Sequence, residues 1–123
     1  KGFGVFVLDD SDGSIKSQEI IKESMSTARV DVKDLAYQYG QGLLDGLSKQ
    51  YVLHAKNPTP MPLVILRSPK TASLLLELGF ISNPDEVRHL IDSEYMEKLS
   101  KDVADILVSQ LFMELGFIVI KRY

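Results

Sequence analysis

The chain has 123 residues, of which 45% are hydrophobic, and its formal net charge is −3. This length predicts one domain with a buried core, and the acidic balance argues against nucleic acid as a partner. The lack of cysteine excludes disulfides and thiolate sites, and no apolar run reaches the roughly 18 residues of a transmembrane segment.

The first part of the chain predicts a strand followed by helices. Residues 3–8 form a short apolar run, typical of a strand buried on both faces. A turn rich in Asp, Ser and Gly is expected at residues 9–14, and a short helix at residues 15–25. Apolar side chains at three- and four-residue spacing then predict a longer amphipathic helix that begins at residue 31 or 34 and ends at Tyr51.

Glycine and proline mark the middle of the chain. Gly40, Gly42 and Gly46 lie within the long predicted helix, where each costs about 1 kcal/mol relative to Ala. Close packing of this helix against a sheet is the expected reason. Residues 55–62 contain three prolines and predict irregular structure. His54 stands before them, and a lone histidine is more often a structural residue than a metal ligand.

The most informative stretch is residues 74–86. After a short buried strand expected at residues 63–66, an apolar run predicts a second strand, and Glu77 interrupts it near its end. A carboxylate in a buried strand must be paired, hydrogen-bonded, neutralised or bound to a metal. An ion pair with a neighbouring Lys or Arg and a functional site at the carboxyl edge of the sheet are both open interpretations of Glu77.

A helix is predicted directly after this strand. Asn83 suits the N-cap and Pro84 the first helical position, and Glu86 is placed to complete a capping box. Ser93 can cap a further helix whose apolar stripe indicates a core-facing surface. The stripe consists of Met96, Leu99, Val103, Ile106, Leu107 and Leu111. Residues 117–120 could add an edge strand at the end of the chain.

Residues 74–86 resemble the signature of the zinc-dependent N-acetylmuramoyl-L-alanine amidases, cell-wall hydrolases that cleave between N-acetylmuramic acid and L-alanine. The resemblance extends upstream through Arg67 and Pro69 and covers Gly2 to about Phe112. It corresponds to the C-terminal part of the family's domain. The matching residues are Leu76, Glu77, Gly79, Phe80, Ser82 and Asn83, with Pro84 and Glu86 beyond them.

The resemblance implies a catalytic role for Glu77. In the family, a zinc-bound water attacks the amide, and the glutamate of this strand acts as general acid and base; by position this is Glu77. The family's zinc ligands lie in motifs that this sequence lacks. Zn2+ is therefore implied as the cofactor, with no ligand from this chain. His54 and His89 stand in other contexts and are not assigned as ligands.

Three interpretations remain open. Residues 1–113 could be the C-terminal portion of an amidase catalytic domain, with residues 114–123 as a tail or extra edge strand. Such a protein would hydrolyse peptidoglycan in the cell envelope, periplasmic or secreted, and this chain alone would be inactive. Alternatively, it is a non-catalytic amidase-like domain that binds cell-wall glycopeptide or a protein partner. The third interpretation is an unrelated α/β domain in which Glu77 forms an ion pair.

The predicted fold is α/β, with a mostly parallel sheet flanked by helices, because strands alternate with helices and form continuous apolar runs. The amidase resemblance makes this an incomplete amidase-type domain. A sheet of three or four strands would expose an apolar edge. We expect the missing N-terminal half, or self-association, to cover that edge.

Overall fold

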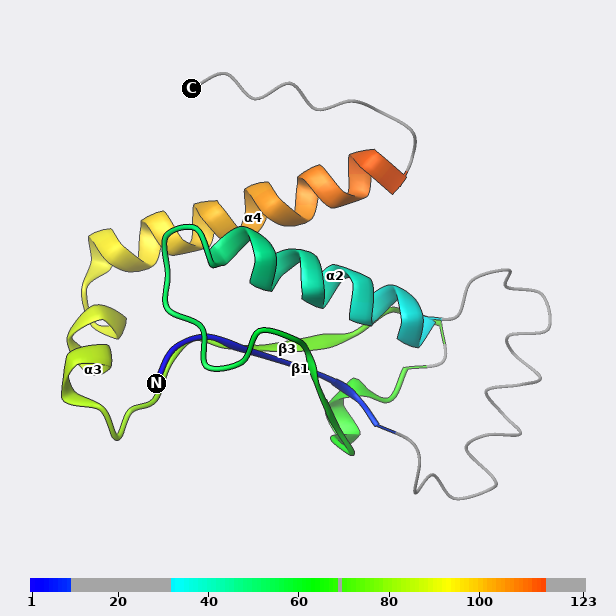
Figure 1. The fold of residues 1–123 in the computed structure, drawn as a ribbon, viewed down its shortest axis with the longest axis horizontal. Coiled ribbons are helices and arrows are strands. Elements are labelled where there is room, and N and C mark those ends of the chain that lie inside the picture. Colours follow the sequence, from blue (N-terminus) through cyan, green and yellow to red (C-terminus); the bar gives the residue numbers. More distant parts are fainter. Residues whose placement is uncertain (10–31, 69, 115–123) are drawn as a thin grey trace.

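The computed structural model describes residues 1–9, 32–68 and 70–114 (Figure 1). The helix predicted at residues 15–25, the strand at residues 117–120 and all but Asp9 of the turn at residues 9–14 lie outside these ranges. The described elements, in chain order, are β1 (Gly4–Leu8), α2 (Val32–Leu47), β2 (Thr59–Met61), a 3-10 helix (Val64–Leu66), β3 (Leu74–Glu77), α3 (Pro84–Leu90) and α4 (Ser93–Glu114).

β1 is the central strand of a three-stranded sheet with the order β2-β1-β3. It pairs in parallel with β2 and antiparallel with β3, so that Gly4 lies opposite Glu77. The α/β class is confirmed, and the sheet is mixed. The described part of the connection from β2 to β3 includes the 3-10 helix, and β3 returns along the other side of β1 in the opposite direction.

In the two segments before β3, the observed structures are the reverse of the predicted ones: the expected strand does not form, and the expected irregular segment contains a strand. The strand expected at residues 63–66 is a 3-10 turn, in which Val64 and Ile65 are each 76% exposed. Thr59–Met61, within the proline-rich segment expected to be irregular, forms β2. Pro60 is tolerated there because β2 is an edge strand, which needs hydrogen bonds on one side only.

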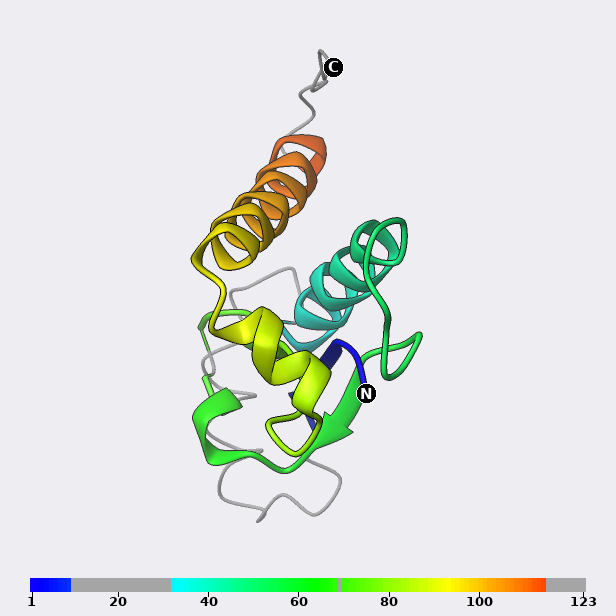
Figure 2. The same ribbon diagram turned by 90° about the vertical axis from the view of Figure 1, so that its left-hand side faces the viewer.

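The core lies between the sheet and the long helices α2 and α4, which both lie on one side of the sheet (Figures 1 and 2). One cluster joins Val5 and Val7 of β1 with Ala36 and Leu44 of α2. A second cluster lies where β1 begins. Its buried members are Phe3, Leu47 and Leu99, against which Met96, Val103 and Ile106 of α4 pack.

The glycines of α2 allow close approach by two different neighbours. A Cβ atom on Gly40 would lie 2.9 Å from Cγ1 of Val5, so the prediction of packing against the sheet is confirmed for this residue. Gly42 and Gly46 instead face α4, where Cβ atoms would meet the side chains of Gln110 and Ile106. Within the described residues, no helix is long and apolar enough to cross a membrane.

Candidate functional site

Glu77 is the last residue of β3 and lies at the end of the sheet where β1 begins, opposite Gly4. Leu74 and Leu76 pack against the core on the helix side. Because side chains alternate along a strand, Glu77 projects from the other face of the sheet. The sequence predicts a possible site at the carboxyl edge of a parallel sheet. β1 and β3 are antiparallel, so the carboxyl end of β3 lies beside the amino end of β1.

One carboxylate oxygen of Glu77 is buried without a partner. Oε1 is shielded from solvent and accepts no hydrogen bond, and the described Lys and Arg residues form no ion pair with it. The ion-pair interpretation of Glu77 therefore has no support among the described residues. An unsatisfied buried acceptor costs about 1–3 kcal/mol. This position thus holds a carboxylate oxygen whose lone pairs no hydrogen bond occupies, although the atom is shielded from solvent.

The turn from β3 to α3 is held by two side chains. Asn83 is the N-cap of α3, as predicted, and its Oδ1 accepts hydrogen bonds from the backbone N–H groups of Asp85 (3.0 Å) and Glu86 (3.3 Å). This forms one half of the predicted capping box, but the return hydrogen bond is absent, because the Asn83 N–H donates to the Phe80 carbonyl. The Glu86 carboxylate instead accepts hydrogen bonds from the backbone N–H groups of Gly2 and, at 2.9 Å, Phe80. Glu86 thereby ties the turn to the segment before β1.

The two glutamates at this end of the sheet differ in their surroundings. The N–H donors of Gly2 and Phe80 hold the pKa of Glu86 below its ordinary range. Glu86 is therefore an ionised carboxylate with both oxygens engaged in hydrogen bonds, whereas Oε1 of Glu77 has none. Of the two, Glu77 is the better candidate for proton transfer.

A cavity of about 440 Å³ lies beside this end of the sheet, on the side of the helices. Glu77 does not line it, but the adjacent residue Leu78 does. One wall is aromatic: the His89 ring stacks on Tyr95 at 4.7 Å, and Tyr95 contacts Tyr51 edge to face at 6.1 Å. The lining also includes Gly2, Phe3, Gln50, Glu86 and Lys98.

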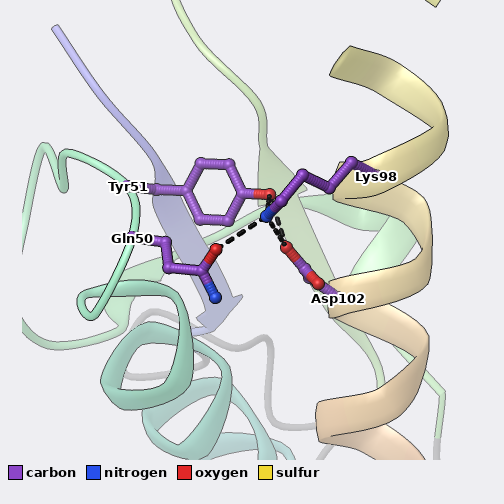
Figure 3. A network of polar contacts seen from close by, with 4 residues as sticks. All are labelled: Gln50, Tyr51, Lys98 and Asp102. Carbon is purple, nitrogen blue, oxygen red and sulfur yellow. Dashed lines mark hydrogen bonds and ion pairs between the residues drawn. The ribbon is translucent and has the colours of Figure 1, made fainter. Parts of the chain in front are cut away.

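Four polar side chains beside this cavity form a closed network (Figure 3). Lys98 Nζ donates hydrogen bonds to Gln50 Oε1 (2.7 Å) and Asp102 Oδ2 (2.8 Å), and the Tyr51 hydroxyl donates to the same Asp102 oxygen (2.6 Å). The Lys98 ammonium lowers the pKa of Asp102, and burial raises the pKa of Tyr51. These groups already have partners, so the network connects the end of α2 to α4 and leaves few polar groups for a ligand.

The two histidines lie in different surroundings. His54 donates its backbone N–H to the Phe3 carbonyl (2.7 Å), and its ring contacts the Phe80 ring at 4.9 Å. His89 belongs to α3 and stacks on Tyr95. Across residues 1–9, 32–68 and 70–114, no three His, Asp or Glu side chains gather in a way that could hold a metal ion. The described residues alone therefore do not fit a zinc site.

Sequence reasoning identified Glu77 and Asn83 but missed two contacts at this end of the sheet. Neither the hydrogen bond from Gly2 to Glu86 nor the contact of His54 with Phe80 has a local sequence signal. The partners are distant in sequence. The pairing of β1 with β3 brings Gly2 near Glu86, and the bridge between Phe3 and Leu53 places His54 on the same side of the chain as Phe80. A capping-box pattern indicated Glu86, but with the wrong partner.

Curated amidases share this sequence over part of their length. The chain is 31% identical over 70 residues to N-acetylmuramoyl-L-alanine amidase AmiA of Escherichia coli. The aligned region makes up 57% of this chain and 24% of that protein. It is 31% identical over 81 residues to a putative N-acetylmuramoyl-L-alanine amidase of Buchnera aphidicola, with an aligned region that makes up 66% of this chain and 37% of that protein. It is 32% identical over 73 residues to probable N-acetylmuramoyl-L-alanine amidase AmiB of Haemophilus influenzae, with an aligned region that makes up 59% of this chain and 17% of that protein.

The matches thus cover between 17% and 37% of the length of these three relatives. The family model described as N-acetylmuramoyl-L-alanine amidase matches residues 1–109, which include every described strand and most of α4. This match spans far more than half of the chain. The chain belongs to the N-acetylmuramoyl-L-alanine amidase family.

Proposed function

We propose that this chain is the C-terminal part of the catalytic domain of a peptidoglycan-hydrolysing N-acetylmuramoyl-L-alanine amidase, and that Glu77 is its proton-transfer residue. Family membership and the names of the relatives support the activity. The observation that carries the assignment of Glu77 is its buried Oε1 atom without a hydrogen-bond partner at the end of β3. The cell envelope, where peptidoglycan lies, is the location that this proposal implies.

The chemistry explains why such a carboxylate is needed. Amide hydrolysis removes a proton from the attacking water and delivers a proton to the nitrogen of the leaving amine, here that of L-alanine. A single carboxylate can carry out both transfers if one oxygen is not already engaged in a hydrogen bond. Oε1 of Glu77 meets that requirement, whereas both oxygens of Glu86 accept backbone hydrogen bonds.

Zinc is part of the proposal through the family resemblance only. The described residues do not supply its ligands, so we infer that other parts of an assembled amidase would supply them. A zinc ion with an open coordination position provides an activated water at neutral pH. We therefore expect hydrolysis from an assembled protein and none from this chain alone.

One observation favours a second candidate function. Because no metal-binding group is found among the described residues, the chain could instead be a non-catalytic amidase-like domain that binds cell-wall glycopeptide or a protein partner. Glycopeptide binding without zinc, together with the absence of hydrolysis in the assembled protein, would favour this function over the first.

The Glu77→Gln variant tests the proposal. The chain is co-produced with the part of E. coli AmiA that lies outside the aligned region, and release of L-alanine-terminated peptides from peptidoglycan is measured. We expect hydrolysis to fall by about 10²–10⁴-fold, because the amide cannot carry the proton. The unfolding midpoint should be nearly unchanged, because Oε1 of Glu77 has no hydrogen bond to lose.

Glu97→Gln is the matched control, because Glu97 is an exposed glutamate of α4. It should retain full hydrolysis. Full activity of Glu77→Gln would remove Glu77 from the mechanism.

A further inference from the structure

An apolar groove of about 530 Å³ lies at the start of β3, between α2, α4 and the 3-10 helix. None of the described residues that line it has a charged side chain. Most of the lining is aliphatic and comes from all four elements: Ala36 of α2, Ile65 and Leu66 of the 3-10 helix, Leu74 and Leu75 of β3, and Leu107 of α4. The groove therefore offers a contact surface for apolar side chains.

Part of this lining is exposed to solvent. Ile65 is 76% exposed and Leu75 is 39% exposed. A single exposed apolar residue is ordinary on a protein surface, and Ile91 at the end of α3, which is 79% exposed, is of that kind. Ile65 and Leu75 differ, because they share one groove with several other apolar residues. Such a contiguous apolar patch marks an interaction surface.

α4 continues this apolar surface beyond the groove. Leu107 lines the groove, and Leu111 follows it after one helical turn, on the same face of α4. Leu111 is 49% exposed, and Val108 beside Leu107 in the sequence is 47% exposed. α4 ends at Glu114. The exposed apolar surface thus runs from the groove to the last turn of α4, directly before residue 115.

The residues that follow α4 in the sequence are suited to cover this surface. Residues 115–120 are Leu, Gly, Phe, Ile, Val and Ile, a run without a polar side chain in a chain of which 25% is charged. Removing apolar surface from water is the main favourable contribution to folding. The family match ends at residue 109, so this run is a feature of the chain for which the match does not account.

The run is long enough to reach the groove. Leu107 lies seven residues before Glu114, which is about 10 Å along the helix axis. Six extended residues span about 20 Å, so a run that turns back at the end of α4 reaches past Leu107. A second copy of the chain could also cover the groove. A segment tethered to α4, however, competes at a far higher effective concentration than a second molecule does.

We propose that residues 115–120 dock in the groove between α2, α4 and the 3-10 helix, where their apolar side chains cover Ile65, Leu75 and Leu111. This inference does not depend on the proposed function, because it concerns contacts within the chain that a catalytic and a non-catalytic domain would share.

The test is a double-mutant cycle in urea unfolding of the full chain. Ile65→Ala shortens a side chain of the groove. Ile91→Ala is the matched control, because Ile91 is equally exposed and does not line the groove. Each substitution is made in the wild-type chain and in a variant that carries both Ile118→Ala and Ile120→Ala. Circular dichroism verifies that every variant folds.

In the wild-type chain, we expect Ile65→Ala to raise the unfolding equilibrium constant by about 5–30-fold, because it removes buried apolar surface. Ile91→Ala should change this constant by no more than about 2-fold. In the variant with Ile118→Ala and Ile120→Ala, the effect of Ile65→Ala should fall to that of Ile91→Ala. Equally small effects of Ile65→Ala and Ile91→Ala in the wild-type chain would overturn the proposal, and so would an effect of Ile65→Ala that persists in the variant.

A spin label measures the proximity directly. The chain has no cysteine, so Lys121→Cys carries a single label at the end of the apolar run. The label should broaden the amide signals of residues 65–66 and 72–75 at every protein concentration. It should leave the signals of α3 unchanged, since α3 follows the far end of β3 (Figure 1). Unbroadened groove signals would overturn the proposal. Broadening that appears only between labelled and unlabelled molecules would overturn it in favour of a second copy.

Discussion

Glu77 and Glu86 lie nine positions apart in the sequence, and their different surroundings give the two carboxylates different hydrogen bonding. Glu77 has a buried oxygen with no partner, while Glu86 accepts two backbone hydrogen bonds from Gly2 and Phe80. The first arrangement costs stability, because a buried acceptor has no hydrogen bond. The second stabilises the turn that positions the end of β3.

Glu86 should make stability depend on pH in the acid range. Its pKa is lowered in the folded state, so the unfolded chain binds the proton first as the pH falls. The stabilisation is therefore complete above the ordinary pKa of a glutamate, about 4.3, and is lost as the pH falls through the lower folded value. Glu86→Gln should lower the thermal midpoint at pH 7, and the difference from wild type should shrink toward pH 3.

Thermal unfolding followed by circular dichroism from pH 3 to 7 measures this difference. Glu97→Gln on exposed α4 is the control and should show no such dependence. A constant difference between Glu86→Gln and wild type across this range would show that the charge of Glu86 is not what holds Gly2 and Phe80.

At the scale of elements, the sequence identified the described helices and the strands β1 and β3, but it misassigned the segments between α2 and β3. Periodicity located α2 and α4, although α4 has Asp92 as its cap and not Ser93: Asp92 Oδ1 accepts a hydrogen bond from the Glu94 N–H at 3.0 Å. Residues 59–61 and 63–66 were assigned wrongly, because pairing with β1 selects the proline-containing segment over the more apolar one. Propensity does not contain that tertiary pairing.

The glycines of α2 give a paired prediction. A Cβ on Gly40 would lie 2.9 Å from Cγ1 of buried Val5 and 3.1 Å from Cγ of Pro58, neither of which has room to move. Gly40→Ala should therefore destabilise the chain by about 1–3 kcal/mol. At Gly42 the neighbour is the flexible end of the Gln110 side chain. Gly42→Ala should be neutral or stabilising by up to about 1 kcal/mol, because alanine favours helix.

Urea unfolding of both variants beside wild type measures the two effects. Equal destabilisation by the two substitutions would mean that Gln110 is held as firmly as Val5. A stable Gly40→Ala variant would mean that α2 does not lie against β1 as closely as the structure has it.

At the scale of the whole molecule, the sequence signature indicated the family and Glu77, but not the surroundings of that residue. The signature is local, from Leu76 to Glu86, whereas the antiparallel pairing of β3 with β1 and the hydrogen bond from Gly2 to Glu86 join distant parts of the chain. The expectation of an exposed apolar edge came from the small number of strands. Its position beside Ile65 and Leu75 required the structure.

The metal content of the whole chain is a further prediction. The sequence has two histidines, and they have separate partners: His54 contacts Phe80, and His89 stacks on Tyr95. We expect far less than one zinc per chain after dialysis against micromolar zinc, measured by elemental analysis. The complex with the part of E. coli AmiA outside the aligned region should hold close to one. Stoichiometric zinc in the chain alone would contradict our view that the ligands come from elsewhere.

The central position of β1 has a consequence for how the protein folds during synthesis. β1 precedes both of its partners in the sequence, and Gly4 pairs with Glu77. Synthesis adds about 5–20 residues per second, so several seconds pass between the synthesis of β1 and the synthesis of its partner strands. Closing such long loops also slows folding. The nascent chain therefore exposes residues 4–8 to chaperones and to aggregation until β2 and β3 have emerged.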